Sequence, residues 1–357
     1  MRKKNLLFST LLAVSVIVGS LLSKLCVKTY AASSTSEIVL DVNSGRILYE
    51  NNAYEKKFMA STTKILTAIT IIDNCNLDDI VTITKESVGI EGSSIYLEEG
   101  EQLCVKDLLY GLMLRSGNDC AVALALHCCG SVEKFAGVMN EKANSLGATN
   151  SHFVNPHGLH DDAHYTTAYD LALISAYAIK NPVFKEIVST KVIRIPFTTR
   201  DTVRSLKNKN KMLFQYEGAN GIKTGFTKKA GRCLVSSVKR NNMELICVVL
   251  NCPPMFERSK ELFNNAFSNY KTYKLIESDH ILDFVSIDRS DDKCGLYVKN
   301  DVLLTLTENE KKNLKIEYEY PKLIKKGVKK NSEIGIIKFY VQNNLIFSEK
   351  IYTIIDT

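Results

Sequence analysis

Apolar residues recur along the middle of this chain with the period of an α-helix. In the segment that starts at Ser61, the residues Ile65, Leu66, Ile69 and Ile72 fall on one helical face. The same spacing recurs in five further segments, the fourth of which ends before Pro182. The pattern therefore predicts helices over residues 61–74, 105–114, 119–127, 132–146, 167–179 and 256–270.

Two pairs of apolar segments on either side of these helices read as β-hairpins. SEIVLDVNSGRILYE places a turn at Asn43-Ser44-Gly45, where glycine adopts a positive φ at little cost. CLVSSV and ELICVVLN flank a second turn at Asn241-Asn242. Strands at both ends with helices between them indicate one sheet that distant segments complete.

Beyond about Leu275 the pattern changes to short alternating segments, which indicate a small all-β sandwich. These segments are ILDFVSI, CGLYV, VLLTLT, LKIEYEY, IGIIKFYV and LIFSEKIY, and turn-forming residues separate them. We therefore expect a larger mixed domain over residues 33–275 and a β-rich domain over 276–357. The 357-residue length agrees with two domains of unequal size.

The first 32 residues have the layout of a secretory signal peptide. Arg2, Lys3 and Lys4 precede an apolar run, and the small residues Ala31 and Ala32 follow it. Polar residues interrupt the run, which makes it marginal as a permanent membrane span, although retention as an N-terminal anchor stays an alternative. The sequence predicts a protein that is exported and works outside the cytoplasm.

Composition adds three constraints. At 45% hydrophobic and 24% charged residues, the chain is globular, which excludes a disordered, collagenous or polytopic membrane protein. The net charge of +7 includes five cations and no acid in the leader, so the mature chain carries +2 and offers little reason to expect nucleic acid. The nine cysteines that follow the leader lack metal-ligand spacing, and we interpret them as buried thiols, with one or two disulfides as the alternative.

Three short motifs carry candidate chemistry. In Ser61-Thr62-Thr63-Lys64, a spacing of three places Ser61 and Lys64 on one helix face, where an amine of lowered pKa can act as base to a hydroxyl. A helix N-terminus also supplies N–H donors for an oxyanion. Taken alone, this motif is better explained by an N-capping serine with a surface lysine.

The second motif is Ser116-Gly117-Asn118, between two predicted helices. Its hydroxyl and amide can relay a proton and hold a substrate amide, although helix punctuation explains the same residues. The third is Lys223-Thr224-Gly225, followed by Phe226. A lysine and a threonine hydroxyl on a strand edge can bind a carboxylate, and the glycine permits close approach of a substrate backbone.

The three motifs together are far more specific than any one of them. Their order and their separations of about fifty and about a hundred residues match the SxxK, SxN and KTG set of the serine penicillin-recognising proteins. The segments MASTTKILTA, LMLRSGNDCA and GANGIKTGFTKKAGRCL carry this match, and NPHGLHDDAHYTTAYDLA and NKNKML add to it. Over nearly the whole mature chain, the sequence resembles the low-molecular-mass penicillin-binding proteins, in particular the D-alanyl-D-alanine carboxypeptidases of peptidase family S11.

The resemblance implies a role for each motif residue. Ser61 attacks the carbonyl of the penultimate D-alanine and Lys64 takes its proton, while Ser116 relays a proton toward the leaving D-alanine. Asn118 holds the substrate amide, and Lys223, Thr224 and Gly225 form the carboxylate-binding strand. The backbone N–H groups of Ser61 and Phe226 form the oxyanion hole.

The resemblance also implies the fold and the partners. The fold is the beta-lactamase/transpeptidase-like αβα sandwich with an antiparallel sheet, in the α/β (α+β) class, followed by the β-domain. The substrate is a peptidoglycan stem peptide that ends in D-Ala-D-Ala, beta-lactams are covalent inhibitors, and neither a metal nor a cofactor is needed. The outer face of the cytoplasmic membrane or the cell wall is the expected location, with association with the membrane surface as a further possibility.

Two other functions stay open at this point. A serine beta-lactamase shares the nucleophile, but the ExxLN-type run that supplies the deacylating Glu of class A enzymes is absent between Ser116 and Lys223. A non-catalytic wall-binding protein with a vestigial site is the second alternative. We interpret His152, His157, His160 and His164 as structural or surface residues, and Arg258 as either a helper of the carboxylate site or a solvated helix residue.

Overall fold

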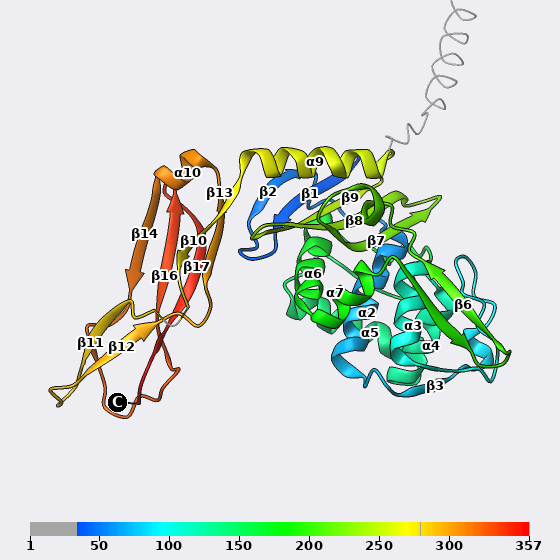
Figure 1. Ribbon diagram of the computed structural model, residues 1–357, viewed down its shortest axis with the longest axis horizontal. Coiled ribbons are helices and arrows are strands. Elements are labelled where there is room, and N and C mark those ends of the chain that lie inside the picture. Colours follow the sequence, from blue (N-terminus) through cyan, green and yellow to red (C-terminus); the bar gives the residue numbers. More distant parts are fainter. Residues whose placement is uncertain (1–33, 279, 357) are drawn as a thin grey trace, which may run out of the picture. The chain divides into compact units, whose positions relative to one another are not determined.

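A five-stranded antiparallel sheet frames the larger domain in the computed structural model, which describes residues 34–278 and 280–356 (Figure 1). The strand order is β2 (Ile47–Asn51), β1 (Ser36–Asp41), β9 (Met243–Leu250), β8 (Gly231–Arg240) and β7 (Ala219–Thr227). Segments about 200 residues apart therefore complete one sheet, as the sequence predicts, and both predicted hairpins form. The predicted leader over residues 1–32 lies outside the described residues.

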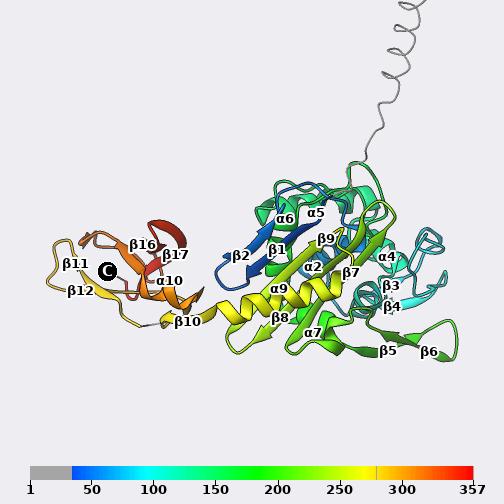
Figure 2. The same cartoon turned by 90° about the horizontal axis from the view of Figure 1, so that it is seen from above.

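Side chains point alternately to the two faces of the sheet along each strand, and this divides the core into two layers. In β1, Ile38 and Leu40 belong to the larger apolar cluster, whereas Val39 belongs to a second cluster on the other face of the sheet. Helices that include α2 (Lys64–Asn74) and α6 (Ala168–Lys180) cover the first face, and α9 (Met255–Asn269) runs across the second (Figure 2). This arrangement confirms the predicted αβα sandwich.

The remaining helices are α3 (Val105–Tyr110), α4 (Asn118–Cys129), α5 (Val132–Ser145), α7 (Pro182–Ser189) and the short α8 (Met212–Gln215). Three of them, α3, α4 and α5, follow predicted segments, whereas α7 and α8 were not predicted. The segment after α3 continues as a π-helix, Gly111–Arg115. Pro182 follows α6, as predicted, but it also opens α7, because a proline fits the first turn of a helix, where its missing N–H costs nothing.

Short elements surround the helical layer. A 3₁₀ turn, Ala60–Thr63, precedes α2, and another covers Lys85–Ser87. Two small antiparallel pairs join β3 (Ile80–Thr82) to β4 (Gln102–Cys104) and β5 (Val192–Phe197) to β6 (Thr202–Lys207). The sequence pattern did not predict the pair β5–β6.

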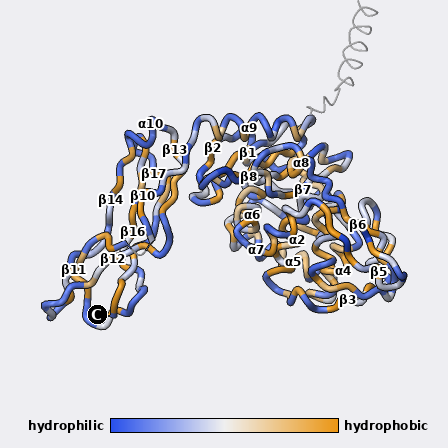
Figure 3. The backbone as a smooth tube through the Cα atoms, viewed as in Figure 1, coloured by the Kyte–Doolittle hydropathy of each residue, from blue (hydrophilic) through white to orange (hydrophobic). Residues whose placement is uncertain are grey.

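The C-terminal domain is built from strands with one short helix, as expected. Its sheet runs β14 (Leu314–Glu319), β16 (Glu333–Val341), β17 (Asn344–Thr353), β12 (Lys293–Tyr297), β11 (Asp283–Ile287) and β15 (Leu323–Ile324), and β10 (Lys271–Ile276) pairs with β13 (Val302–Leu306). The helix is α10 (Glu308–Lys312). Apolar residues of both sheets share one cluster, and Figure 3 shows the alternation of hydrophobic and hydrophilic positions along these strands. The boundary after residue 275 stays a prediction, and β10 pairs with a strand that lies beyond it.

Two further observations concern the cysteines and the helices. The nine cysteines of the described residues are free thiols, five of them buried, which supports their interpretation as small apolar side chains. Within residues 34–278 and 280–356, no single helix has the length and apolar character to cross a membrane; α4 and α5, bent by 85°, meet those requirements only as a pair.

Candidate active site

Lys64 lies at the centre of the candidate site. Ser61 occupies the 3₁₀ turn before α2, and Lys64 is the first residue of that helix. The Nζ atom of Lys64 lies 3.2 Å from Oγ of Ser61, 2.6 Å from Oδ1 of Asn118 and 2.5 Å from the carbonyl oxygen of His157. The lysine side chain is fully buried. The first two predicted motifs therefore meet at one buried amine.

The protonation state of Lys64 follows from its surroundings. Burial, and after it the positive charge of Lys223, hold the pKa of Lys64 well below its ordinary value. A neutral amine has two N–H donors and one lone pair. Because Asn118 Oδ1 and the carbonyl of His157 only accept hydrogen bonds, they take the two donors, and the lone pair then faces the hydroxyl of Ser61. This is the arrangement that a general base for Ser61 needs.

The second motif is shaped by the junction between the π-helix and α4. Ser116 adopts a left-handed conformation, with φ of 67°, and Asn118 begins α4. The side chain of Asn118 is fixed at both ends, since its Nδ2 donates to the carbonyl of Glu91 at 2.5 Å while its Oδ1 faces Lys64. Ser116 and Asn118 are both buried. The motif thus brings a hydroxyl and an oriented amide to the same place as Ser61 and Lys64.

The third motif lies on β7, an edge strand that packs against the 3₁₀ turn of Ser61. A Cβ atom on Gly225 would lie 2.9 Å from the carbonyl oxygen of Met59 and 3.2 Å from the backbone nitrogens of Ser61 and Thr62. These are backbone atoms, so only glycine fits here. The close approach sets the distance between the strand that carries Lys223-Thr224-Gly225 and the backbone of Ser61.

Lys223 and Thr224 point to different sides of β7, as successive residues of a strand do. Lys223 is 2% exposed and donates to the carbonyl of Thr224 at 3.0 Å. Burial, followed by the charge of Lys209, lowers the pKa of Lys223 to about 7. Thr224 instead lines an open cavity. Lys223 therefore supplies positive potential from beneath the strand, while Thr224 supplies the accessible hydroxyl.

The cavity has a volume of about 360 Å³ and joins residues of all three motifs. Three cations and no acid line it. Its full lining consists of Ser61, Ser93, Ser116, Lys209, Lys211, Thr224, Gly225, Phe226, Arg232, Met255 and Phe256. The combination of serine hydroxyls, a threonine and three cations suits an anionic substrate with a reactive carbonyl.

A loop over residues 88–101 forms one wall of the site and is held by residues that the sequence analysis missed. Buried Asp119, next to Asn118 in α4, accepts the backbone N–H groups of Ile95 and Leu97, at 3.0 and 3.2 Å, and the hydroxyl of Ser94 at 2.5 Å. These bonds tie the loop that carries Glu91 and Ser93 to the helix of the second motif. The acidic residue directly after the SxN motif was the sequence signal that could have revealed this role.

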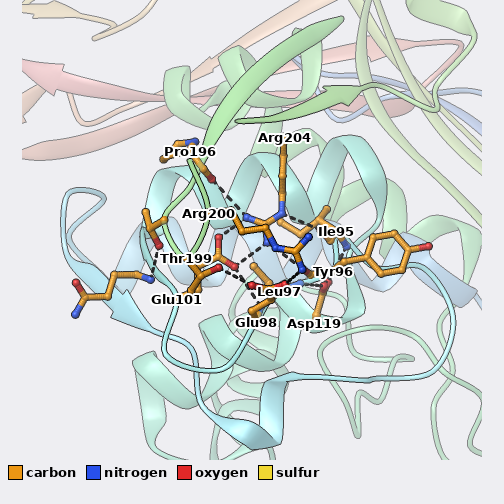
Figure 4. Close-up of polar contacts among 12 residues, drawn as sticks. Ile95, Tyr96, Leu97, Glu98, Glu101, Asp119, Pro196, Thr199, Arg200 and Arg204 are labelled. Atoms are coloured by element: carbon orange, nitrogen blue, oxygen red, sulfur yellow. Dashed lines mark hydrogen bonds and ion pairs between the residues drawn. The ribbon is translucent and has the colours of Figure 1, made fainter. Parts of the chain in front are cut away.

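Arg204 of β6 fixes the same loop from the opposite side (Figure 4). Its guanidinium forms a buried ion pair with Glu101 and donates to the carbonyls of Ile95 and Tyr96, each at 2.9 Å. The ring of Phe197 stacks 3.5 Å from its Cζ atom. Since Arg204 and Glu101 are 103 residues apart in the chain, no local pattern could have paired them.

Two of the four histidines have buried structural contacts. His164 accepts the N–H of Val154 through Nδ1 at 3.1 Å, so its Nε2 carries the proton and donates to Oγ1 of Thr63 at 2.8 Å. Burial lowers the pKa of His164 to about 4 and that of His157 to about 3. Both imidazoles are therefore neutral at pH 7 and support the site through fixed hydrogen bonds.

The contacts of Arg258 differ from both roles that the sequence analysis considered for it. Its guanidinium contacts both carboxylate oxygens of Glu37 at 2.8 Å and the hydroxyl of Tyr49 at 2.9 Å. It joins α9 to the strands β1 and β2, and it is not among the residues that line the cavity.

Comparison with known protein families identifies a match for each of the two domains. Residues 24–253 match the family described as D-alanyl-D-alanine carboxypeptidase, peptidase S11. Residues 270–356 match the family described as penicillin-binding protein 5, C-terminal domain.

Individual relatives cover most of the chain. The D-alanyl-D-alanine carboxypeptidase DacF of Bacillus subtilis is 31% identical over 86% of this chain and 81% of its own length. DacA of Escherichia coli K12 is 32% identical over 96% of this chain and 89% of its own length. The crystal structure of penicillin binding protein 5 from Haemophilus influenzae has a TM-score of 0.78 at 29% identity, covering 90% of this chain and 96% of that protein.

Proposed function

The chain belongs to the S11 family of serine D-alanyl-D-alanine carboxypeptidases, and we propose that Ser61 is its nucleophile and Lys64 its general base. The contacts of Lys64 carry this proposal. Its buried amine lies 3.2 Å from Oγ of Ser61, and two acceptors occupy the rest of its hydrogen-bonding capacity.

The reaction proceeds through an acyl-enzyme. Oγ of Ser61 attacks the carbonyl carbon of the penultimate D-alanine while its proton passes to Nζ of Lys64. The backbone N–H groups of Ser61 and Phe226 stabilise the oxyanion, and each such donor typically contributes ~10²–10³ in rate. The C–N bond then breaks, and the departing amine receives a proton through the hydroxyl of Ser116. Water hydrolyses the resulting ester and regenerates Ser61.

The substrate is held on both sides of the scissile bond. Asn118 uses one N–H of its side-chain amide to bind Glu91, which leaves the second for a substrate carbonyl. On the leaving side, the hydroxyl of Thr224 binds the terminal carboxylate, with positive potential from Lys223 beneath the strand. Gly225 allows this strand to approach the nucleophile closely enough for both contacts.

The substrate class is a peptidoglycan stem peptide that ends in D-Ala-D-Ala, which lies outside the cytoplasm. The leader-like segment before residue 33 supports export, with the membrane surface or the cell wall as the place of action. Beta-lactams acylate Ser61, because their strained amide and carboxylate resemble the D-Ala-D-Ala end. The C-terminal domain carries none of the proposed catalytic residues, and we assign it no chemical step.

Release of D-alanine from a pentapeptide tests this function. The wild-type protein should release one D-alanine per peptide, and Ser61→Ala should release none while its thermal unfolding stays near that of the wild type. Absence of release by folded wild-type protein would refute the enzyme and favour the vestigial wall-binding alternative. Rapid turnover of penicillin, with no long-lived acyl-enzyme, would instead favour the beta-lactamase.

A further inference from the structure

The mouth of the cavity is strongly cationic. Lys209, Lys211 and Arg232 line it together with no carboxylate. Lys209 is engaged, since its Nζ donates to Oγ of Ser93 at 3.0 Å. Lys211 lies 5.8 Å from the ring of Phe256, and Arg232 lies 5.0 Å from the ring of Phe226. The ion pairs found across residues 34–278 and 280–356 do not include Arg232.

The other cations near the KTG strand are poorly suited to hold a carboxylate by direct contact. Lys223 is 2% exposed and is not among the residues that line the cavity, so its amine is not presented to a carboxylate there. Arg258 already binds both oxygens of Glu37. An arginine at the cavity mouth, in contrast, stays charged at any physiological pH and presents a planar pair of donors.

Strand register places Arg232 on the same side of the sheet as Thr224. Phe226 pairs directly with Arg232 across β7 and β8, so their side chains leave the sheet on one face. Thr224 lies two residues before Phe226 and projects to that face as well. Arg232 and Thr224 therefore leave the sheet on the same face, and both line the same cavity. The aromatic ring of Phe226 limits the freedom of the Arg232 guanidinium and lowers the entropy lost on binding.

We propose that Arg232 is a specificity-determining residue that pairs with the terminal carboxylate of the substrate beside Thr224 and so restricts the enzyme to peptides with a free C-terminus. This inference rests on the proposed function, because it assumes that the leaving residue occupies the cavity mouth. The pairing forms when substrate binds and persists in the transition state. It therefore lowers KM without a matching change in kcat.

The size of the effect follows from the exposure of the site. A charge-assisted pair of an arginine and a carboxylate is strong when buried, but Phe226 is 56% exposed and the pair at this rim is partly solvated. We therefore expect loss of the guanidinium to raise KM about tenfold, the change that a modest charged hydrogen bond produces. The same loss should not affect a peptide that lacks the carboxylate.

The test uses the full-length protein and an N-acylated L-Lys-D-Ala-D-Ala peptide, together with the same peptide as its C-terminal amide. For Arg232→Gln, KM for the free peptide should rise about tenfold with kcat within twofold. The inhibition constant of the amide, measured as protection against penicillin acylation, should stay unchanged. Arg232→Lys should recover part of the affinity, because it restores the charge without the planar fork.

Arg240→Gln is the matched control. Arg240 ends the same strand and also lies over aromatic rings, at 4.7 Å from Tyr216 and from Phe267, but it does not line this cavity. Its KM should equal that of the wild type. An unchanged KM in Arg232→Gln, or an equal loss of affinity for the free peptide and the amide, overturns the inference while the proposed function stands. Failure of the wild type to release D-alanine refutes the proposed function itself.

Discussion

Replacement of Gly225 by alanine tests how the KTG strand and the proposed nucleophile, Ser61, are held together. The added Cβ would meet the carbonyl oxygen of Met59 at 2.9 Å, about 0.5 Å inside the 3.4 Å at which ordinary contact begins. It would also meet the backbone nitrogen of Ser61 at 3.2 Å. These atoms belong to a buried turn, so β7 and the turn must move apart.

That movement separates the two proposed oxyanion donors, the N–H groups of Ser61 and Phe226. Loss of one such donor costs ~10²–10³ in rate, so we expect the acylation rate of Gly225→Ala to fall about 100-fold. Overpacking of a filled interior typically costs about 1–3 kcal/mol, which for a domain of this size lowers Tm by about 2–12 °C. The variant should therefore fold and yet react slowly.

The assay is the second-order rate of labelling by a fluorescent penicillin, with Tm measured in parallel. Gly137→Ala is the matched control, because Gly137 lies in α5 with nothing within 4 Å of the position that an added Cβ would take, and alanine favours a helix. It should label at the wild-type rate with unchanged or slightly higher Tm. If Gly225→Ala labels within about threefold of the wild-type rate, the strand does not position the oxyanion donors as described.

Three other predictions concern Lys64, Arg204 and His164. Because a general base must be neutral, the acylation rate should increase as pH rises through the lowered pKa of Lys64. Lys64→Arg, which stays charged, should acylate about 10³-fold more slowly in stopped-flow labelling. An acylation rate that does not change with pH would contradict this role of Lys64. Arg204→Met leaves the fully buried Glu101 without its partner and should lower the free energy of unfolding, measured in urea, by about 3–5 kcal/mol. Arg200→Met removes an ion pair on the surface and should lower it by at most about 1 kcal/mol. Equal losses in the two variants would contradict the structural role given to the buried pair. His164 has a folded pKa of about 4, below the 6.5 of the unfolded chain, so the unfolded state alone gains a proton as pH falls from 6.5 toward 4. Stability is lost in that window, by about 2 kcal/mol between pH 6.5 and 5, and this part of the loss should disappear in His164→Gln when unfolding free energies are compared at the two pH values.

The fold could be predicted where sequence pattern and local chemistry agree. The turn at Asn43-Ser44-Gly45 forms as expected, with Gly45 at φ of 70°, because positive φ is a local property of glycine. The apolar spacing from Ile65 to Ile72 likewise gave α2. These features depend on neighbours in the sequence, and the sequence displays them directly.

The pair β5–β6 shows where such reasoning stops. Most residues of this pair are exposed, and one of the two buried positions of β6 is the charged residue Arg204. The residue is buried because Glu101 neutralises it from a distant part of the chain. In the sequence, a buried arginine cannot be distinguished from an exposed one, so β6 does not show the alternation of apolar and polar residues that predicts a strand.

The candidate site divides in the same way. Ser61, Lys64, Ser116 and Asn118 were predicted from motif spacing; Ser61 and Asn118 contact the amine of Lys64, and Ser116 lines the same cavity as Ser61. Asp119 and Arg204 were not, because the loop that they hold has no motif of its own. Lys223 was predicted as a carboxylate ligand, and its burial beneath the strand is a property of the sheet that only the structure reveals.

Location of the covalent penicillin adduct tests the central claim most directly. Ring opening by a serine loses no atoms, so intact-protein mass spectrometry should show a gain of one whole penicillin molecule per chain, and peptide mapping should place it on Ser61. Ser61→Ala should gain no mass under the same conditions. An adduct on Ser116 or elsewhere, or an adduct that persists in Ser61→Ala, would contradict the assignment of the nucleophile.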